Sequence, residues 1–143
     1  MKPQIAAVAV AVVLAVLSVL HVYWGVRGEF GRSAAIPEVD GRPLFVPTRA
    51  ACFAVAALLA VAVGLLLIGG RYLPDLGPRW LGTVGPLAVG VVLVARAVGD
   101  FKYVGFFKRV HGSRFAVLDS RYFSPLCLVL GLGALWSVLG RGR

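Results

Sequence analysis

The sequence is poor in acidic residues, cysteine and histidine, and four long stretches of it carry no charge. Its 143 residues include six Asp or Glu, two Cys and two His against fifteen Lys or Arg. The cysteines do not form a CxxC pair, and no second histidine stands at helical spacing, so no metal or haem site is expected. A Ser-His-Asp spacing, a phosphate-binding glycine loop and a nucleotide motif are also lacking. The chain therefore shows none of the patterns that define the common motif-based enzymes, and we predict no cofactor.

Apolar residues dominate what is present. They make up 59% of the chain and the mean hydropathy is +0.89, whereas a soluble domain is about 45–50% apolar. The uncharged runs are residues 5–22, 50–69, 81–95 and 126–139. Because about 20 apolar residues cross the hydrocarbon core of a bilayer, these runs predict an integral membrane protein. The net charge of +9 then belongs to cations that flank the spans and meet lipid headgroups, and nucleic acid is not expected as a partner.

The runs predict an all-α fold, an integral membrane four-transmembrane-helix bundle that forms a single domain over residues 1–143. The expected spans are about 3–26, 49–69, 80–98 and 124–140. The first run is longer than a signal-peptide core and no cleavage site follows it, so we predict a retained helix. Small residues in the spans are expected to allow close helix packing. They are Ala56, Ala60, Gly64, Gly82, Gly85, Gly90, Gly131 and Gly133.

An even number of spans places both termini on one side of the membrane, here called side A, together with the 70–79 turn. The two long connections, 27–48 and 99–124, fall on the other side, called side B, and are predicted to form a cap over the bundle. Most Lys and Arg residues lie on side B, which predicts that side B is cytoplasmic. Asp40-Gly41 favours a type I′ hairpin within the first connection, with an irregular proline-stiffened loop as the alternative.

The second connection and the fourth span leave one structural question open. Ser113 is predicted to cap a short interfacial amphipathic helix over residues 114–123, with Phe115, Leu118 and Tyr122 on one face. Ser124-Pro125 is predicted to open the fourth helix as N-cap and first-turn proline. Residues 125–139 would span roughly 22 Å, less than the hydrocarbon thickness. Either the preceding residues lengthen this helix, or the segment dips inward and Asp119 and Arg121 line a polar recess.

Three stretches carry a resemblance to a known family. HVYWGVRG, AIPEVDGRPLFVP and RAVGDFKYVGFFKRVHGSRFAVLDSRYFSPLCLVLG follow one another in this order. Together they resemble an uncharacterised, domain-of-unknown-function family of small bacterial four-span membrane proteins. The resemblance implies the four-helix fold and a bacterial cell membrane, and it implies no activity. A fold-level likeness to DoxX-like four-helix membrane proteins, some of them linked to quinone or thiol redox systems, rests on span number and size alone.

Charged and aromatic residues gather at the side-B ends of the spans, where they predict a polar, basic recess. Arg96 and Asp100 would stand at i,i+4 on one face if the third helix continued past residue 98. Ionisable groups at membrane depth usually mark a functional site, although a structural salt bridge is the alternative. The predicted ligand-binding set is Arg96, Asp100, Lys102, Tyr103, Lys108, Arg109, His21, Trp24, Arg27, Asp119 and Arg121.

Other candidates for chemistry are weaker. Cys52 and Cys127 both lie near the side-B starts of their helices, where either a redox pair or two buried apolar thiols would fit. Either Glu38 or Asp40 is expected to pair with Arg42, and Asp119 is expected to pair with Arg121 or Arg114. The catalytic candidates are Asp100, His21 and Tyr103 as acid–base groups.

These features predict a protein that binds a small amphipathic or anionic molecule, such as a lipid, quinone or isoprenoid, beneath the cap. A membrane-embedded enzyme acting on such a molecule is the first alternative. A structural subunit whose cap docks a partner membrane protein is the second. The bilayer is the expected partner, and the small-residue spans suit either a monomeric bundle or a homodimer. Polar residues lie only near side B, which argues against a simple channel.

Overall fold

The computed structural model describes residues 2–26, 28, 31–74 and 77–140. Four helices in this part of the chain are long and apolar enough to cross a membrane. The first three are α1 (Pro3–Val26), α2 (Arg49–Gly69) and α3 (Leu81–Val98). The fourth combines α4 (Arg114–Leu118), the π-helical turn η2 (Asp119–Phe123) and α5 (Ser124–Leu139). The predicted all-α, four-helix membrane fold is confirmed.

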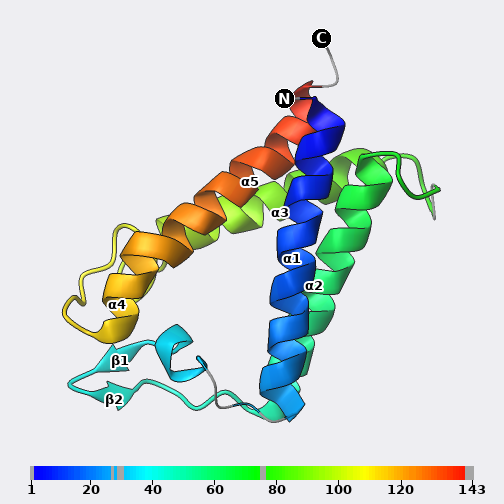
Figure 1. The fold of residues 1–143 in the computed structure, drawn as a ribbon. Helices are drawn as coiled ribbons and strands as arrows, with labels where there is room; N and C mark the ends of the chain where they lie inside the picture. The colour runs from blue at the N-terminus through cyan, green and yellow to red at the C-terminus, as the bar shows by residue number, and fades with distance from the viewer. Residues whose placement is uncertain (1, 27, 29–30, 75–76, 141–143) are drawn as a thin grey trace.

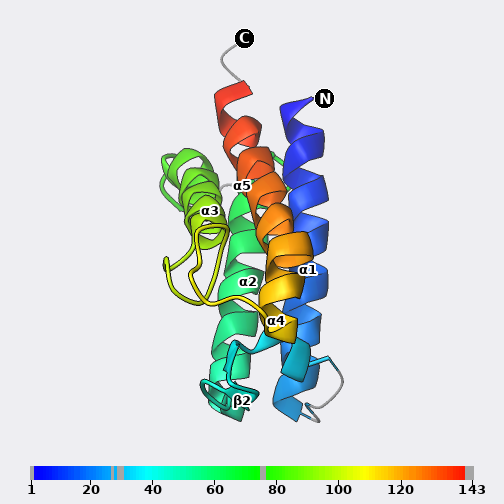
Figure 2. The ribbon, with the colours of Figure 1, turned by 90° about the vertical axis from the view of Figure 1, so that its left-hand side faces the viewer.

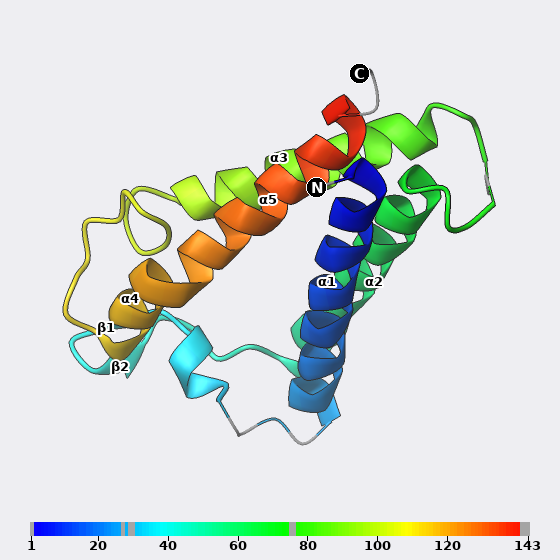
Figure 3. The ribbon, with the colours of Figure 1, turned by 45° about the horizontal axis from the view of Figure 1, so that its top comes forward.

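The helices are arranged as two packed pairs, α1 with α2 and α3 with α5. The pairs meet near the chain termini at side A and diverge toward side B, as Figures 1 and 3 show. The buried core includes Leu14, Leu66, Val89 and Leu130, one from each long helix. Only 22–28% of the most apolar window of each helix is buried. So much exposed apolar surface fits lipid contact and would not be tolerated in water.

Small residues allow the closest helix contacts, as predicted. A Cβ added at Gly90 would lie 3.0 Å from the carbonyl oxygen of Gly131, and a Cβ at Gly131 would lie equally close to the Gly90 oxygen. The backbones of α3 and α5 therefore approach closely at this point, and Figure 2 shows the two helices side by side. In the other pair, Ser18 Oγ donates a 2.8 Å hydrogen bond to the Ala56 carbonyl across the α1–α2 contact.

The fourth helix corrects two of the predictions. Ser113 does cap residue Ala116, but the segment it starts is not a separate interfacial helix, because it runs on as one 26-residue helix, Arg114–Leu139. Ser124 lies inside this helix and its side chain makes no cap. Pro125 lacks an N–H and its ring crowds the carbonyl four residues earlier. The π-helical turn just before it, closed by the Ser124 N–H on the Asp119 carbonyl, lets the helix continue past the proline.

The first connection forms the predicted hairpin. Strands β1 (Glu38–Val39) and β2 (Arg42–Pro43) pair antiparallel. Asp40 and Gly41 have φ of 50° and 73°, the double positive φ of a type I′ turn. The hairpin and the short 3₁₀ helix η1 (Ser33–Ala35) lie against α4, so the first connection bridges the side-B opening between the two helix pairs (Figure 1).

Candidate functional site

Asp119 is the centre of a buried charge cluster at the side-B end of the molecule. Its side chain is fully buried in the π-helical turn η2. One carboxylate oxygen accepts a 2.9 Å hydrogen bond from Arg96 Nη2. The other accepts from Lys108 Nζ at 3.0 Å and from the Gly105 amide at 2.8 Å. The ion pairs made by the described residues are these two, and both use Asp119.

Lys108 is held as tightly as Asp119. Its side chain has no exposed surface, which is rare for lysine. Nζ donates to the Gly105 carbonyl at 2.9 Å, to Asp119 at 3.0 Å and to Ser120 Oγ at 2.7 Å. These acceptors use all three of its N–H donors. The cluster therefore ties the second connection to η2 and, through Arg96, to α3.

The pairing of Arg96 differs from the one predicted. Helix α3 ends at Val98, and Gly99 follows with a φ of 94°. Asp100 is thus turned away from the helix face, and Arg96 pairs with Asp119 instead. The predicted pairing of Asp119 with Arg121 or Arg114 is also wrong. The path of the second connection brings Lys108 to the carboxylate, and Arg96 reaches it from the end of α3.

Asp100 organises the loop that follows α3. One carboxylate oxygen accepts from the amides of Lys102, Tyr103 and Val104 at 2.7–2.9 Å. Desolvation opposes its ionisation, but the three amides outweigh that effect and hold the pKa of Asp100 below its ordinary value of 3.8. These bonds hold one oxygen of the carboxylate in its own loop, and Asp100 does not line the cavity described below, so its role as a general base stays a prediction.

The low pKa of Asp100 predicts a pH dependence of the loop. A carboxyl whose pKa is depressed on folding stabilises the fold fully above its unfolded pKa of about 3.9, and this contribution is lost as the pH falls through the folded pKa. Amide protection factors of residues 102–104 should therefore stay constant down to about pH 4 and decline below it. In Asp100→Asn, whose amide oxygen still accepts hydrogen bonds, protection should not depend on pH. Loss of protection well above pH 4 in the wild type would contradict this assignment.

A cavity of about 440 Å³ lies beside the cluster, between α1 and the α4–η2–α5 helix. Its walls are mainly apolar, with Arg96, His21 and Trp24 as polar or amphipathic members. The residues that line it are Leu17, Leu20, His21, Trp24, Gly31, Ala35, Arg96, Phe115, Phe123, Leu126 and Cys127. A second cavity of about 210 Å³ under the first connection shares His21, Trp24 and Ala35 with it. The two cavities thus adjoin at the His21–Trp24 wall.

Arg96 and His21 bring polar atoms to this cavity wall. Arg96 uses Nη2 on Asp119, whereas Nη1 is buried and has no hydrogen-bond partner among the described residues. His21 Nδ1 lies 2.8 Å from the Leu17 carbonyl. Since a carbonyl only accepts, Nδ1 carries a proton, and in the neutral ring Nε2 is the acceptor. The His21 ring also stands edge-on to Trp24, with centroids 4.9 Å apart.

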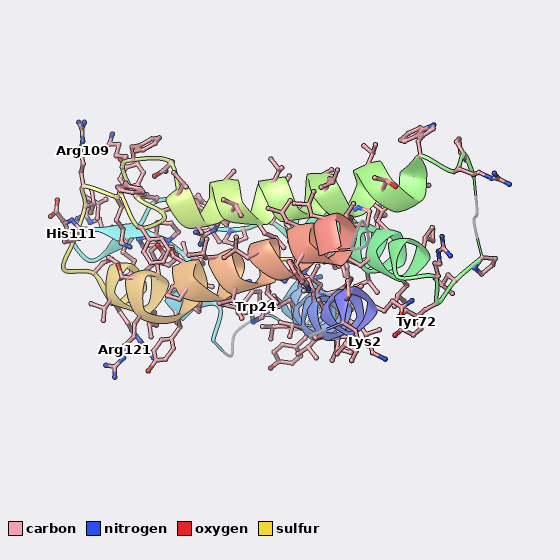
Figure 4. All side chains as sticks on the ribbon, turned by 90° about the horizontal axis from the view of Figure 1, so that it is seen from above. Lys2, Trp24, Tyr72, Arg109, His111 and Arg121 are labelled. Atoms are coloured by element: carbon pink, nitrogen blue, oxygen red, sulfur yellow. The ribbon has the colours of Figure 1, made fainter. Side chains whose placement is uncertain are left out.

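The structure separates the other predicted site residues from this cavity. Lys102, Arg109 and Arg121 are exposed, and Figure 4 shows Arg109 and Arg121 projecting from the edge of the molecule. Lys102 lies over the Tyr103 ring at 4.9 Å. The Tyr103 side chain beside it holds the pKa of Lys102 above its ordinary value. Arg27 lies outside the described residues.

The remaining candidates stay apart from one another. Cys52 and Cys127 are free thiols and line different cavities. Glu38 and Asp40 make no ion pair among the described residues, so the predicted pairing with Arg42 is wrong. No group of three or more His, Cys, Asp or Glu that would hold a metal ion occurs in the part of the chain that the structure describes.

Sequence reasoning missed most of the apolar cavity wall and the acceptors around Lys108. Leu17, His21 and Trp24 are spaced at i, i+4 and i+7 and therefore lie on one face of α1. No such signal links this face to Phe115, Phe123 or Cys127 on the fourth helix. Gly105 and Ser120 give no signal, because their roles depend on a backbone amide and on the path of a loop.

Comparison with known families agrees with this architecture. Residues 5–134 match the family described as "Protein of unknown function (DUF3995)". The chain belongs to this family. The match covers most of each of the four spans, the cap and the Asp119 cluster, so the predicted resemblance to an uncharacterised family is confirmed. No curated protein and no solved structure matches the chain, and the likeness to DoxX-like proteins is not shown.

Proposed function

We propose that this membrane protein binds a small amphipathic or anionic molecule, such as a lipid, quinone or isoprenoid, in the 440 Å³ cavity at side B. Arg96 carries the proposal, because its Nη1 is buried without a partner among the described residues and the side chain forms part of the cavity wall. An unsatisfied buried donor costs about 1–3 kcal/mol. A carbonyl, phosphate or carboxylate oxygen of a ligand would remove that cost if the guanidinium rotated to turn the buried Nη1 toward the cavity.

The shape and lining of the cavity support an amphipathic ligand. Its volume lies within the roughly 300–1,000 Å³ of small-molecule sites. Phe115, Phe123 and Leu126 offer an apolar wall, while Arg96 and His21 offer polar atoms. A ligand would place its head group against Arg96 and its apolar body between α1 and α5. The adjoining cavity provides further apolar space under the first connection.

The proposal includes a location and an orientation. We place the protein in a bacterial cell membrane with side B in the cytoplasm, because Lys and Arg are more numerous in the two long connections. Exposed Phe101 and Phe107, whose rings lie 6.3 Å apart, stand beside Lys102 and Arg109. Aromatic rings interleaved with cations suit the headgroup layer. A position in the headgroup layer accounts for Lys102 and Arg109, two predicted site residues that lie outside the cavity.

His21 supports the enzyme alternative. Of the three predicted acid–base groups, Asp100, His21 and Tyr103, only His21 lines the cavity. Its Nδ1 hydrogen bond to Leu17 leaves Nε2 as the atom that would take a proton from a bound molecule. If the protein is an enzyme, the molecule bound in the cavity is its substrate.

Native mass spectrometry with a matched pair of variants tests the proposal. We expect the wild type, purified in mild detergent, to carry a discrete bound mass that Cys127→Trp loses, because the indole would fill the cavity. Val129→Trp is the control, since Val129 is on the same helix but 66% exposed, and it should keep the adduct. Both variants must melt within a few degrees of the wild type. No adduct on the wild type, or equal loss from both variants, would exclude a ligand in the cavity and favour the docking subunit.

A further inference from the structure

The side-A end of the molecule has a basic recess that the side-B site does not involve. Two cavities of about 510 and 370 Å³ adjoin there and share Gly69 and Arg71. Arg79 lines the larger one and Lys2 the smaller one. None of the described residues that line either cavity is acidic. None of the three cations forms an ion pair with another described residue.

Arg71 adopts a backbone conformation that residues other than glycine rarely adopt. It follows the end of α2 with a φ of 64°, and its amide and that of Tyr72 bond back to the carbonyls of Ile68 and Leu67. This is the left-handed position that usually terminates a helix as glycine. Two glycines, Gly69 and Gly70, come directly before it. An arginine in this conformation carries a backbone cost in free energy, which motivates the hypothesis that its side chain has a role here.

The surroundings of the recess are those of a membrane–water interface. It lies where the apolar spans α2 and α3 end, and Tyr72 and Trp80 beside it are 53% and 59% exposed. Exposed Tyr and Trp at span ends belong to the headgroup layer. In Figure 4, Lys2 and Tyr72 lie at neighbouring helix ends on this side of the molecule. Arginine guanidinium groups at this depth match a phosphate with two charge-assisted hydrogen bonds.

We propose that the side-A recess, formed by Arg71, Arg79 and Lys2, binds the phosphate headgroup of an anionic phospholipid. The larger cavity holds the headgroup between the two arginines, and Ile68 and Leu73 in its wall contact the start of the acyl chains. The recess is independent of the side-B cavity.

The test compares phosphatidylglycerol with phosphatidylcholine of the same chain length by native mass spectrometry. We expect the wild type to prefer phosphatidylglycerol. Arg71→Gly/Arg79→Gln should lower this preference by about fivefold for each arginine removed. Arg71→Gly also relieves the positive φ, so this variant should fold at least as well as the wild type while binding less lipid. If Arg71 instead stabilised the fold, the variant with Arg71→Gly would melt at a lower temperature than the wild type.

Arg42→Gln/Arg114→Gln is the matched control, since it removes the same charge from exposed positions at the other end of the molecule. It should keep the preference for phosphatidylglycerol. Equal loss from both double variants would show charge attraction without a site and would overturn the proposal, as would the absence of any lipid preference in the wild type. Displacement of phosphatidylglycerol by inorganic phosphate would identify a soluble anion as the ligand and would overturn the lipid assignment.

Discussion

Asp119→Asn is expected to lower the free energy of unfolding by about 3–5 kcal/mol, the cost of breaking a buried ion pair by removing one partner. The carboxylate is completely buried and accepts from Arg96, Lys108 and the Gly105 amide. The amide keeps the shape but leaves the Lys108 ammonium buried without a counter-charge. Thermal or denaturant unfolding in mild detergent measures the loss.

Two variants separate the charge effect from other causes. Asp40→Asn is the control, because Asp40 is exposed in the hairpin turn and asparagine tolerates its positive φ, so its effect should stay within about 0.5 kcal/mol. In a Lys108→Met background, Asp119→Asn should cost much less than in the wild type, since the unpaired ammonium is gone. Equal cost in both backgrounds would show that the Lys108–Asp119 pair is not the source of the stability.

Gly99→Ala is expected to prevent the second connection from reaching Asp119. Gly99 has a φ of 94° and a ψ of −171°, a conformation almost restricted to glycine that costs other residues about 1–3 kcal/mol. A Cβ there would also overlap the carbonyl oxygen of Val104, and one at Gly105 would overlap that of Val98. The two glycines let the chain fold back on the end of α3, where the Phe106 amide bonds the Ala97 carbonyl at 2.9 Å.

Gly112→Ala is the matched control for this prediction. Gly112 has a φ of 96° but open space around its Cβ position, so it should show the conformational cost alone. Gly99→Ala should have a much lower melting temperature than Gly112→Ala. Hydrogen exchange at the Phe106 amide should also be much faster in Gly99→Ala. Similar behaviour of the two variants would mean that the close backbone contact does not hold the loop.

The Asp119 cluster and the cavity show where prediction from sequence fails. The sequence identified Arg96, Lys108 and Asp119 as site residues. Charged side chains near membrane depth carry a free-energy cost and usually occur where they pair with one another or form a functional site. It paired Arg96 with Asp100, since the four-residue spacing assumes that α3 continues. A glycine with positive φ ends the helix two residues earlier, and Asp119 becomes the partner from 23 residues away.

The sequence by itself determined the four spans, and it offered the Asp40-Gly41 hairpin as one of two structures for the first connection. These depend on the length of apolar runs and on the φ values that two adjacent residues accept, both of which are local. Only the tertiary structure decided that Lys108 is buried, that Arg96 Nη1 lacks a partner among the described residues, and that Arg71 and Arg79 share a recess. Each of these depends on how separate helices pack and on the path of a connection, which no local pattern encodes.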